Sequence, residues 1–242
     1  MTLSLIQPGE GPERDVLLLY FTTARTKDLA AIVGPSVCVI AQNAPSFSKW
    51  GADGVATLDE TLAWARSNGA GTFQMGHLAL GGFSAGCQAV GLHLKAGVEP
   101  FATLCADGIH SGLNPSPEGL ALWRHQADRA RAGDAWALWS YSEIVPPTYR
   151  GTKPTIEDIV GHTLPVGDPP AITQEGNLVL WGVAGDNAAA HMVSLNTEMP
   201  EMVAMAASGE PGHGDWTAPG GGGAGMFAFG VGLALGFWAM GW

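Results

Sequence analysis

The chain has 242 residues, 46% of them hydrophobic, which is enough to bury the core of one ordinary domain and excludes wholesale disorder. Its 22 aspartates and glutamates outnumber its 11 lysines and arginines, so the formal net charge is −11. No basic cluster opposes this trend, and a surface of this sign repels a polyanion, so we expect no nucleic-acid partner.

Short apolar runs spread along the chain are typical of buried strands. They are apolar on both faces, which favours parallel strands covered by helices on both sides. The predicted strands are Val16–Phe21, Val37–Ala41, Leu78–Phe83, Phe101–Ala106 and Leu178–Val183. Helical spacing predicts helices over Gly54–Ser67, Ala85–Lys95 and Ala188–Ala207. The alternation predicts an α/β fold with a mostly parallel sheet of about five to six strands flanked by helices.

Residues 111–174 interrupt this alternation. The segment is rich in proline, with a predicted helix over Pro117–Gly133 and an aromatic run that follows it. An insertion of this length usually lies over the carboxyl edge of a sheet as a lid or a binding wall. We therefore expect Trp139 and Tyr141, together with His110 just before the insertion, to contact the substrate.

The strongest chemical signal is the G-x-S-x-G motif formed by residues 82–86, with Ser84 at its centre. The motif directly follows a predicted strand and opens a predicted helix. In that setting the glycines allow a tight turn that lifts the serine hydroxyl above the sheet edge, where it can act as a nucleophile. The alternative interpretation is a glycine-rich turn in which the serine only caps the helix.

These features resemble the α/β-hydrolase superfamily, over most of residues 15–207. In size the chain is similar to cutinase-like esterases rather than to large lipases. The stretches GGFSAGCQAV and ADGIHSG are also similar to uncharacterised hydrolase-like proteins of bacteria and their tailed phages. The resemblance implies one hydrolase domain over residues 1–207, with a catalytic serine followed along the chain by an acid and then by a histidine.

A nucleophilic serine needs a base to take its proton and an acid to orient that base. Asp107 and Asp186 each follow a predicted strand and would lie at the carboxyl edge of the sheet, where ligands bind. His191 and His213 both come late enough in the chain to act as the base. The two consistent sets are Ser84–Asp107–His191, which we favour, and Ser84–Asp186–His213, whose histidine follows no recognisable strand.

The expected oxyanion hole combines the backbone N–H of Ala85 with one from Thr22 or Thr23 after the first predicted strand. No nucleotide-binding glycine motif and no HExxH motif is present in the sequence, so we expect no cofactor and no metal. The three cysteines lie in or beside apolar runs, which favours buried thiols over a disulfide framework or a zinc site.

Composition divides the end of the chain into two segments. Residues 208–223 are rich in glycine and proline, as a linker is. Residues 224–242 are uncharged, apolar and glycine-rich, and they approach the ~20 residues that span a bilayer. We expect this tail to contact a membrane or another protein subunit. The N-terminal residues show no secretory signal, which predicts a cytoplasmic or virion-associated protein.

Together these features predict a serine hydrolase that cleaves a carboxylic ester through an acyl-serine intermediate. The expected substrate is a small-molecule, glycan or lipid ester. Two alternatives stay open. The same scaffold supports an amidase or peptidase, because both reactions pass through a similar tetrahedral intermediate. The glycine-rich tail also fits a non-catalytic assembly subunit, for example of a phage particle, that keeps the hydrolase fold.

Overall fold

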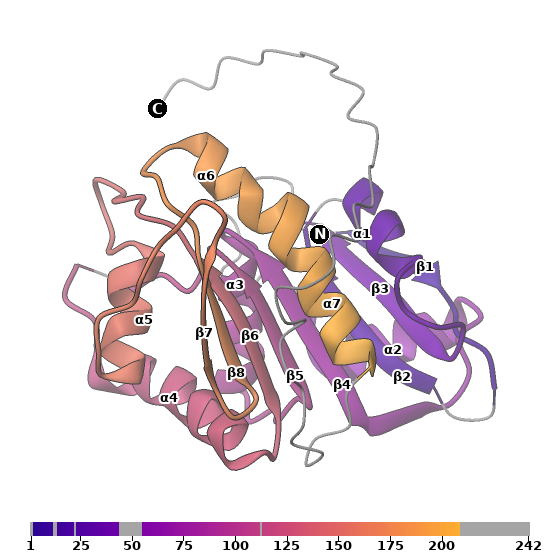
Figure 1. The fold of residues 1–242 in the computed structure, drawn as a ribbon. Helices are drawn as coiled ribbons and strands as arrows, with labels where there is room; N and C mark the ends of the chain where they lie inside the picture. The colour runs from indigo at the N-terminus through magenta and orange to yellow at the C-terminus, as the bar shows by residue number, and fades with distance from the viewer. Residues whose placement is uncertain (1, 12–13, 22, 44–54, 112, 209–242) are drawn as a thin grey trace.

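The computed structural model describes residues 2–11, 14–21, 23–43, 55–111 and 113–208 (Figure 1). In this part of the chain eight strands form one sheet, in the order β1-β3-β2-β4-β5-β6-β8-β7. The strands are β1 (Thr2–Gln7), β2 (Arg14–Tyr20), β3 (Val37–Asn43), β4 (Phe73–Phe83), β5 (Ala102–Ala106), β6 (Trp136–Tyr141), β7 (Ala171–Glu175) and β8 (Leu178–Gly182). The helices are α1 (Thr23–Ala30), α2 (Leu58–Ser67), α3 (Gly86–Lys95), α4 (Pro117–Ala132), α5 (Thr152–Val160), α6 (Ala188–Val193), the π-helical turn η2 (Ser194–Glu198) and α7 (Met199–Ser208).

The sheet is parallel except at its two edges. Strand β2 pairs in parallel with β3 on one side and with β4 on the other, and β4, β5, β6 and β8 continue in parallel. The edge strands β1 and β7 are antiparallel to their neighbours. Strand β2 is followed along the chain by β3 on one side of it, whereas β4, on its other side, is followed by β5 still further out. The carboxyl ends of β2 and β4 therefore form the switch point, where open α/β sheets bind ligands.

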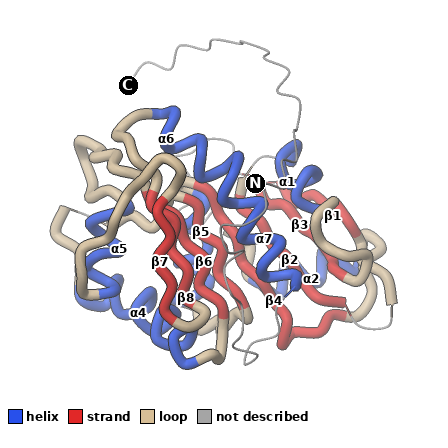
Figure 2. The backbone as a smooth tube through the Cα atoms, in the orientation of Figure 1, coloured by secondary structure: helices blue, strands red, loops and turns tan. Residues whose placement is uncertain are grey.

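Helices cover both faces of the sheet (Figure 2). Apolar side chains of α2, α3, α4 and α5 pack on one face, and those of α1, η2 and α7 pack on the other. Helices α6, η2 and α7 form one continuous rod that crosses the sheet, the C-terminal rod (Figure 1). These features make an α/β-hydrolase-like fold, so the predicted fold class is confirmed.

The sequence prediction missed three of the eight strands found in the described residues. Strand β6 lies between β5 and β8, so residues 111–174 are not one insertion over the sheet edge but include a central strand. Its six residues are all buried, and the aromatic side chains that suggested a binding wall are its core contacts. The edge strands β1 and β7 are mixed apolar and polar segments, with none of the continuous apolar character of the predicted strands.

Residues 208–242, which contain the predicted linker and tail, lie outside the described residues except for Ser208 at the end of α7. Among the helices of the described residues, none has the length and apolar character needed to cross a membrane. The three cysteines are free thiols and are buried, as predicted.

Candidate active site

The motif around Ser84 forms a sharp turn between β4 and α3. Ser84 has a backbone φ of 52°, a left-handed conformation that costs free energy for any residue with a side chain. The flanking glycines are needed because of close packing. A Cβ on Gly82 would lie 2.6 Å from the backbone nitrogen of Cys87, and one on Gly86 would overlap the carbonyl oxygen of Tyr20. The turn therefore has the tight strand-to-helix shape that is called a nucleophile elbow in proteins where its serine is catalytic.

Asp107 lies directly beside this elbow, after the last residue of β5. Phe83 and Ala106 are paired in the parallel ladder, and the Ser84 N–H donates to the Ala106 carbonyl at 2.9 Å. Asp107 also has a positive φ, of 42°, and the next residue, Gly108, is so close to the Ser84 carbonyl that a Cβ would overlap it. Two strained non-glycine residues thus adjoin at the carboxyl edge of the sheet.

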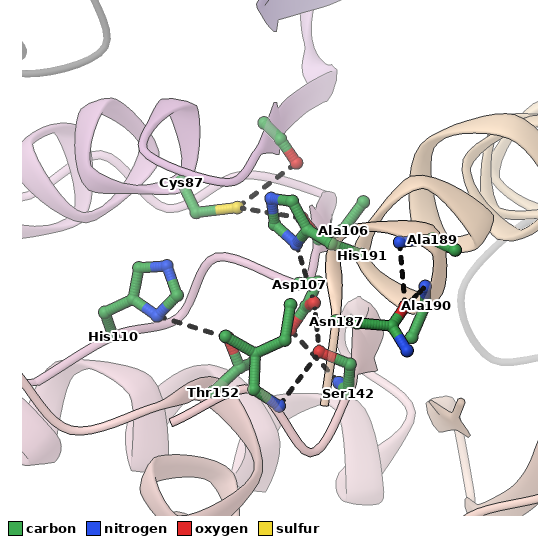
Figure 3. A network of polar contacts seen from close by, with 12 residues as sticks. Cys87, Ala106, Asp107, His110, Ser142, Thr152, Asn187, Ala189, Ala190 and His191 are labelled. Carbon is green, nitrogen blue, oxygen red and sulfur yellow. Dashed lines mark hydrogen bonds and ion pairs between the residues drawn. The ribbon is translucent and has the colours of Figure 1, made fainter. Parts of the chain in front are cut away.

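His191 comes to the same place from α6, at the start of the C-terminal rod. Asn187 caps this helix, its side-chain oxygen accepting hydrogen bonds from the N–H groups of Ala189 and Ala190. The Nδ1 atom of His191 lies 2.7 Å from Oδ2 of Asp107 (Figure 3). The imidazole also lies against the ring of Phe83, the residue before Ser84, with ring centroids 4.5 Å apart and the ring planes tilted by 32°. His191 is therefore held between Asp107 and the turn that carries Ser84.

The Asp107 carboxylate is buried, with 2% of its surface exposed, and it accepts several hydrogen bonds. Ser142, which follows β6, donates its backbone N–H to Oδ1 at 3.1 Å and its hydroxyl to Oδ2 at 2.5 Å (Figure 3). Burial by itself raises the pKa of Asp107, but the hydrogen bonds from His191 and Ser142 outweigh it and the pKa is lowered. The carboxylate is thus ionised and fixed in orientation.

His110 lies three residues beyond Asp107 and its Nδ1 atom is 3.2 Å from the Thr152 hydroxyl. Its ring contacts that of Tyr149, with centroids 4.8 Å apart. Burial lowers the pKa of His110 to about 4, so the ring is neutral at pH 7. His110 also lines a cavity of about 360 Å³ between α3, the loop after β5 and α4. That placement is compatible with the predicted contact to substrate.

Two aromatic residues that were predicted to contact substrate lie in the core instead. Trp139 and Tyr141 are fully buried in β6. The indole N–H of Trp139 donates to the Thr103 hydroxyl at 3.0 Å, and the Tyr141 hydroxyl donates to the Pro165 carbonyl at 2.5 Å. The prediction failed because an aromatic run in a sequence does not distinguish a pocket wall from a strand packed between helices.

The other predicted site residues are only partly described. Asp186 is exposed in the loop before α6, and His213, its predicted partner, lies outside the described residues. Thr22 is also outside them, whereas Thr23 is the first residue of α1 and Ala85 is the residue before α3. Within the described residues no group of three or more potential ligand side chains could hold a metal ion.

Sequence analysis did not single out Ser142 as part of this site. The sequence signal for Ser142 is its position, because it follows the carboxyl end of a core strand just as Ser84 and Asp107 do. Once residues 136–141 are assigned as the strand next to β5, a polar residue at 142 is expected beside Asp107. The contact between Phe83 and His191 has no sequence signal, because it depends on where the C-terminal rod crosses the sheet.

Comparison with known proteins gave no matching family model and no matching curated protein. Among solved structures the chain is similar to enterochelin esterase from Shigella flexneri, with 12% identity and a TM-score of 0.48. That match covers 83% of this chain and 53% of the esterase, so the chain spans about half the length of that relative. A thermophilic esterase from Thermogutta terrifontis is 12% identical over 77% of this chain and 76% of its own, with a TM-score of 0.41. The Vlm2 thioesterase domain is 12% identical over 84% and 95%, with a TM-score of 0.36.

Proposed function

We propose that the protein is a serine hydrolase that cleaves carboxylic esters, with Ser84 as nucleophile, His191 as base and Asp107 as the acid that orients the base. The observation that carries the proposal is the 2.7 Å contact between His191 and Asp107, made beside a serine in a strained strand-to-helix turn. Strained non-glycine residues gather at functional sites, and the two found in the described residues are the proposed nucleophile and the proposed acid.

In the proposed mechanism the Ser84 hydroxyl oxygen attacks the ester carbonyl carbon while Nε2 of His191 takes the hydroxyl proton. Nδ1 carries the other ring proton and donates it in a hydrogen bond to Oδ2 of Asp107, which stabilises the imidazolium. The tetrahedral intermediate collapses when Nε2 returns its proton to the leaving alcohol, and the acyl group stays on Ser84. Water, activated by the same nitrogen, then releases the acid and restores the serine.

The oxyanion that forms on the carbonyl needs hydrogen-bond donors that are already in position. We assign this role to the backbone N–H of Ala85, which directly follows the nucleophile, and to that of Thr23. Thr23 opens α1 just after β2, and the first N–H groups of a helix have no acceptor within that helix. Removing one such donor typically costs about 10²–10³-fold in rate.

Labelling with a fluorophosphonate probe tests the proposal, because the probe reacts only with an activated serine. We expect the wild type to label and Ser84→Ala not to label. His191→Ala and Asp107→Asn should label about 10³-fold more slowly or worse, because the base is lost or held in the wrong tautomer. His213→Ala is the matched control and should label at the wild-type rate.

Two outcomes contradict the proposal. Loss of labelling in His213→Ala but not in His191→Ala would assign the base to the alternative set. A folded wild type that never labels would favour the non-catalytic assembly role.

Ester and amide chemistry are separated by a panel of substrates with the same acyl group and either an ester or an amide bond. We expect the esters to be hydrolysed and the matched amides to react far more slowly.

A further inference from the structure

The cavity that His110 lines has no part in the mechanism above. Its walls come from α3, from the loop after β5 and from α4, and it is named the α3–α4 cavity below. Its volume of about 360 Å³ lies at the lower end of the ~300–1,000 Å³ that is usual for pockets that bind small molecules. The cavity therefore has room for one small ligand group.

The α3–α4 cavity adjoins the turn that carries Ser84. Cys87, which lines the cavity, follows Ser84 by one helical turn, and its N–H donates to the Ser84 carbonyl at 3.0 Å. Gly108, which also lines the cavity, is so close to the same carbonyl that a Cβ would overlap it. A group held in the cavity therefore lies next to the residue that would carry the acyl group.

His110 connects the cavity with the proposed acid. Its Nδ1 atom lies 3.2 Å from the Thr152 hydroxyl (Figure 3). A hydrogen bond from the same hydroxyl is one of the contacts that lower the pKa of Asp107. The charges of Asp107 and His191 in turn act on the pKa of His110. One side of the cavity therefore lies beside the proposed acid and base.

The walls of the cavity favour an uncharged, apolar occupant. Large apolar side chains of α3, the loop after β5 and α4 line it, namely Leu92, Ile109, Leu120, Leu122 and Trp123. The described residues that line it include no Lys, Arg, Asp or Glu, and His110 is neutral at pH 7 because burial lowers its pKa to about 4. A charge placed in such surroundings without a partner is costly.

The hydroxyl and thiol groups that line the cavity already have partners within the protein. The Ser111 and Thr155 hydroxyl groups lie 2.9 Å apart and are hydrogen-bonded to each other. The Ser116 hydroxyl caps α4 by accepting the Gly119 N–H at 3.0 Å, and the Cys87 thiol donates to a backbone carbonyl of β4 at 3.1 Å. These groups need no hydrogen bond from a ligand, so they do not oppose an apolar chain.

Gly91 of α3 keeps space open in front of Trp123 of α4. Both residues line the cavity, and a Cβ on Gly91 would lie 3.3 Å from Cζ2 of Trp123, closer than an ordinary contact. Glycine within a helix is less favourable than alanine. The missing side chain at residue 91 therefore weakens α3 slightly but leaves the cavity wide enough to fill.

We propose that the α3–α4 cavity holds the acyl group of the substrate, and that this group is an uncharged apolar chain of medium length. This inference rests on the proposed function, in which Ser84 attacks the ester carbonyl. The chain then runs from Ser84 past Cys87 and His110 and ends between Gly91 and Trp123. Gly91 is thus the residue that sets how long a chain is accepted.

The first test measures kcat/KM for 4-nitrophenyl esters that share one alcohol and differ in the acyl group, from acetyl through butanoyl and hexanoyl to octanoyl. Each methylene buried in an apolar pocket raises kcat/KM about threefold to fourfold. In the wild type we therefore expect the hexanoyl ester to react at least about tenfold faster than the acetyl ester. A profile that is flat from acetyl to hexanoyl would overturn the proposal.

Substitution of Gly91 should shorten the accepted chain. In Gly91→Leu we expect kcat/KM for the octanoyl ester to fall at least about tenfold, and that for the acetyl ester to stay within about twofold of the wild type. Gly91→Ala adds one methyl group and favours the helix, so it should fold and lower the octanoyl value about threefold. Equal losses for both esters in these variants would overturn the proposal.

Gly34→Leu is the matched control for the Gly91 variants. Gly34 precedes β3 at the amino end of the parallel strands, away from the cavity, and a Cβ there meets no atom within 4 Å. We expect its chain-length profile to be that of the wild type. The same shortening in Gly34→Leu would overturn the assignment to this cavity.

A charged acyl group tests the apolar character. The 4-nitrophenyl half ester of glutaric acid carries a carboxylate where the pentanoyl ester carries a methyl group. We expect the half ester to react at least about tenfold more slowly, even at a salt concentration that screens the net charge of −11. Equal values of kcat/KM for the two esters would overturn the proposal.

A binding measurement separates this inference from the proposed function. Methyl hexanoate is titrated by calorimetry into Ser84→Ala, which cannot form an acyl-serine. We expect saturable binding that is at least about fivefold weaker when Gly91→Leu is added.

The outcomes of the two proposals are then distinct. Binding that depends on Gly91, in a protein whose wild type neither labels nor hydrolyses esters, would contradict the hydrolase proposal and support the α3–α4 cavity as a site for apolar chains. An active wild type whose chain-length profile and methyl hexanoate binding are unchanged by Gly91→Leu would support the hydrolase proposal and overturn this inference.

Discussion

At the scale of single residues, the contribution of the Ser142 hydroxyl to the labelling rate can be measured most directly. Its hydroxyl bonds Oδ2 of Asp107 at 2.5 Å, on the same oxygen that His191 contacts, and its backbone N–H bonds Oδ1. The hydroxyl therefore helps to fix which way the carboxylate faces the imidazole. Because it adds a donor to a carboxylate, it also helps to keep the pKa of Asp107 low.

We expect Ser142→Ala to lower the fluorophosphonate labelling rate about tenfold, equivalent to about 1.4 kcal/mol, close to the lower end of the ~1.5–3 kcal/mol that a hydrogen bond to a charged group contributes. The loss is partial because the backbone N–H of residue 142 stays in place. Ser111→Ala is the matched control, since the Ser111 hydroxyl bonds Thr155 at the same sheet edge and is not part of the contacts of Asp107. An equal loss of rate in both variants would show that the effect is general loosening and not orientation of Asp107.

At the scale of elements, the elbow depends on the close approach of α3 to β2 and β4. Gly86→Ala places a methyl group on the carbonyl oxygen of Tyr20 in β2, so the helix must move or the turn must open. We expect a melting temperature lower by several degrees and loss of labelling, because overpacking of this kind costs about 1–3 kcal/mol or more. Gly34→Ala is the matched control, because a Cβ there meets no atom within 4 Å. Wild-type stability in Gly86→Ala would contradict the packing argument.

The helices and strands also show how much of the fold and of the candidate site could be predicted from the sequence. Five strands were predictable because each is a continuous apolar run, and the elbow was predictable because its glycines mark a turn between a strand and a helix. Strand β6 was not, since a run of tryptophan and tyrosine within a proline-rich segment fits a binding wall equally well. The pairing of Asp107 with His191 could be proposed as one of two sets, but the contact of His191 with Phe83 could not be foreseen, because it depends on where the rod crosses the sheet.

At the scale of the whole molecule, two buried groups and one partly buried group give stability a defined dependence on pH. Burial lowers the pKa of His93 and of His110 to about 4, against about 6.5 for an unfolded histidine. His93 is also hydrogen-bonded to the Tyr20 hydroxyl in the core. Burial raises the pKa of Glu198 to about 8, from about 4.3 in an unfolded chain. The fold therefore disfavours protonation of the two histidines and ionisation of the glutamate.

These shifts act in opposite directions as pH changes. Between about pH 4.5 and 6.5 the unfolded chain binds two more protons on the histidines and one fewer on the glutamate, so stability rises with pH. Between about pH 6.5 and 8 only the glutamate differs, the folded protein binds the extra proton, and stability falls with rising pH. We expect the contribution of these groups to the free energy of unfolding to be greatest near pH 6.5.

Denaturant unfolding over pH 4 to 9 checks this expectation, with one variant for each side of the maximum. His93→Gln should flatten the acid side, where each histidine contributes up to about 3 kcal/mol between pH 6.5 and 4. Glu198→Gln should flatten the alkaline side and leave the acid side steeper, because the opposing glutamate contribution is gone. A wild-type curve that keeps rising above pH 7, or a Glu198→Gln curve parallel to it throughout, would show that Glu198 is ionised in the folded protein at neutral pH. The carboxyl group would then need a compensating partner within the fold.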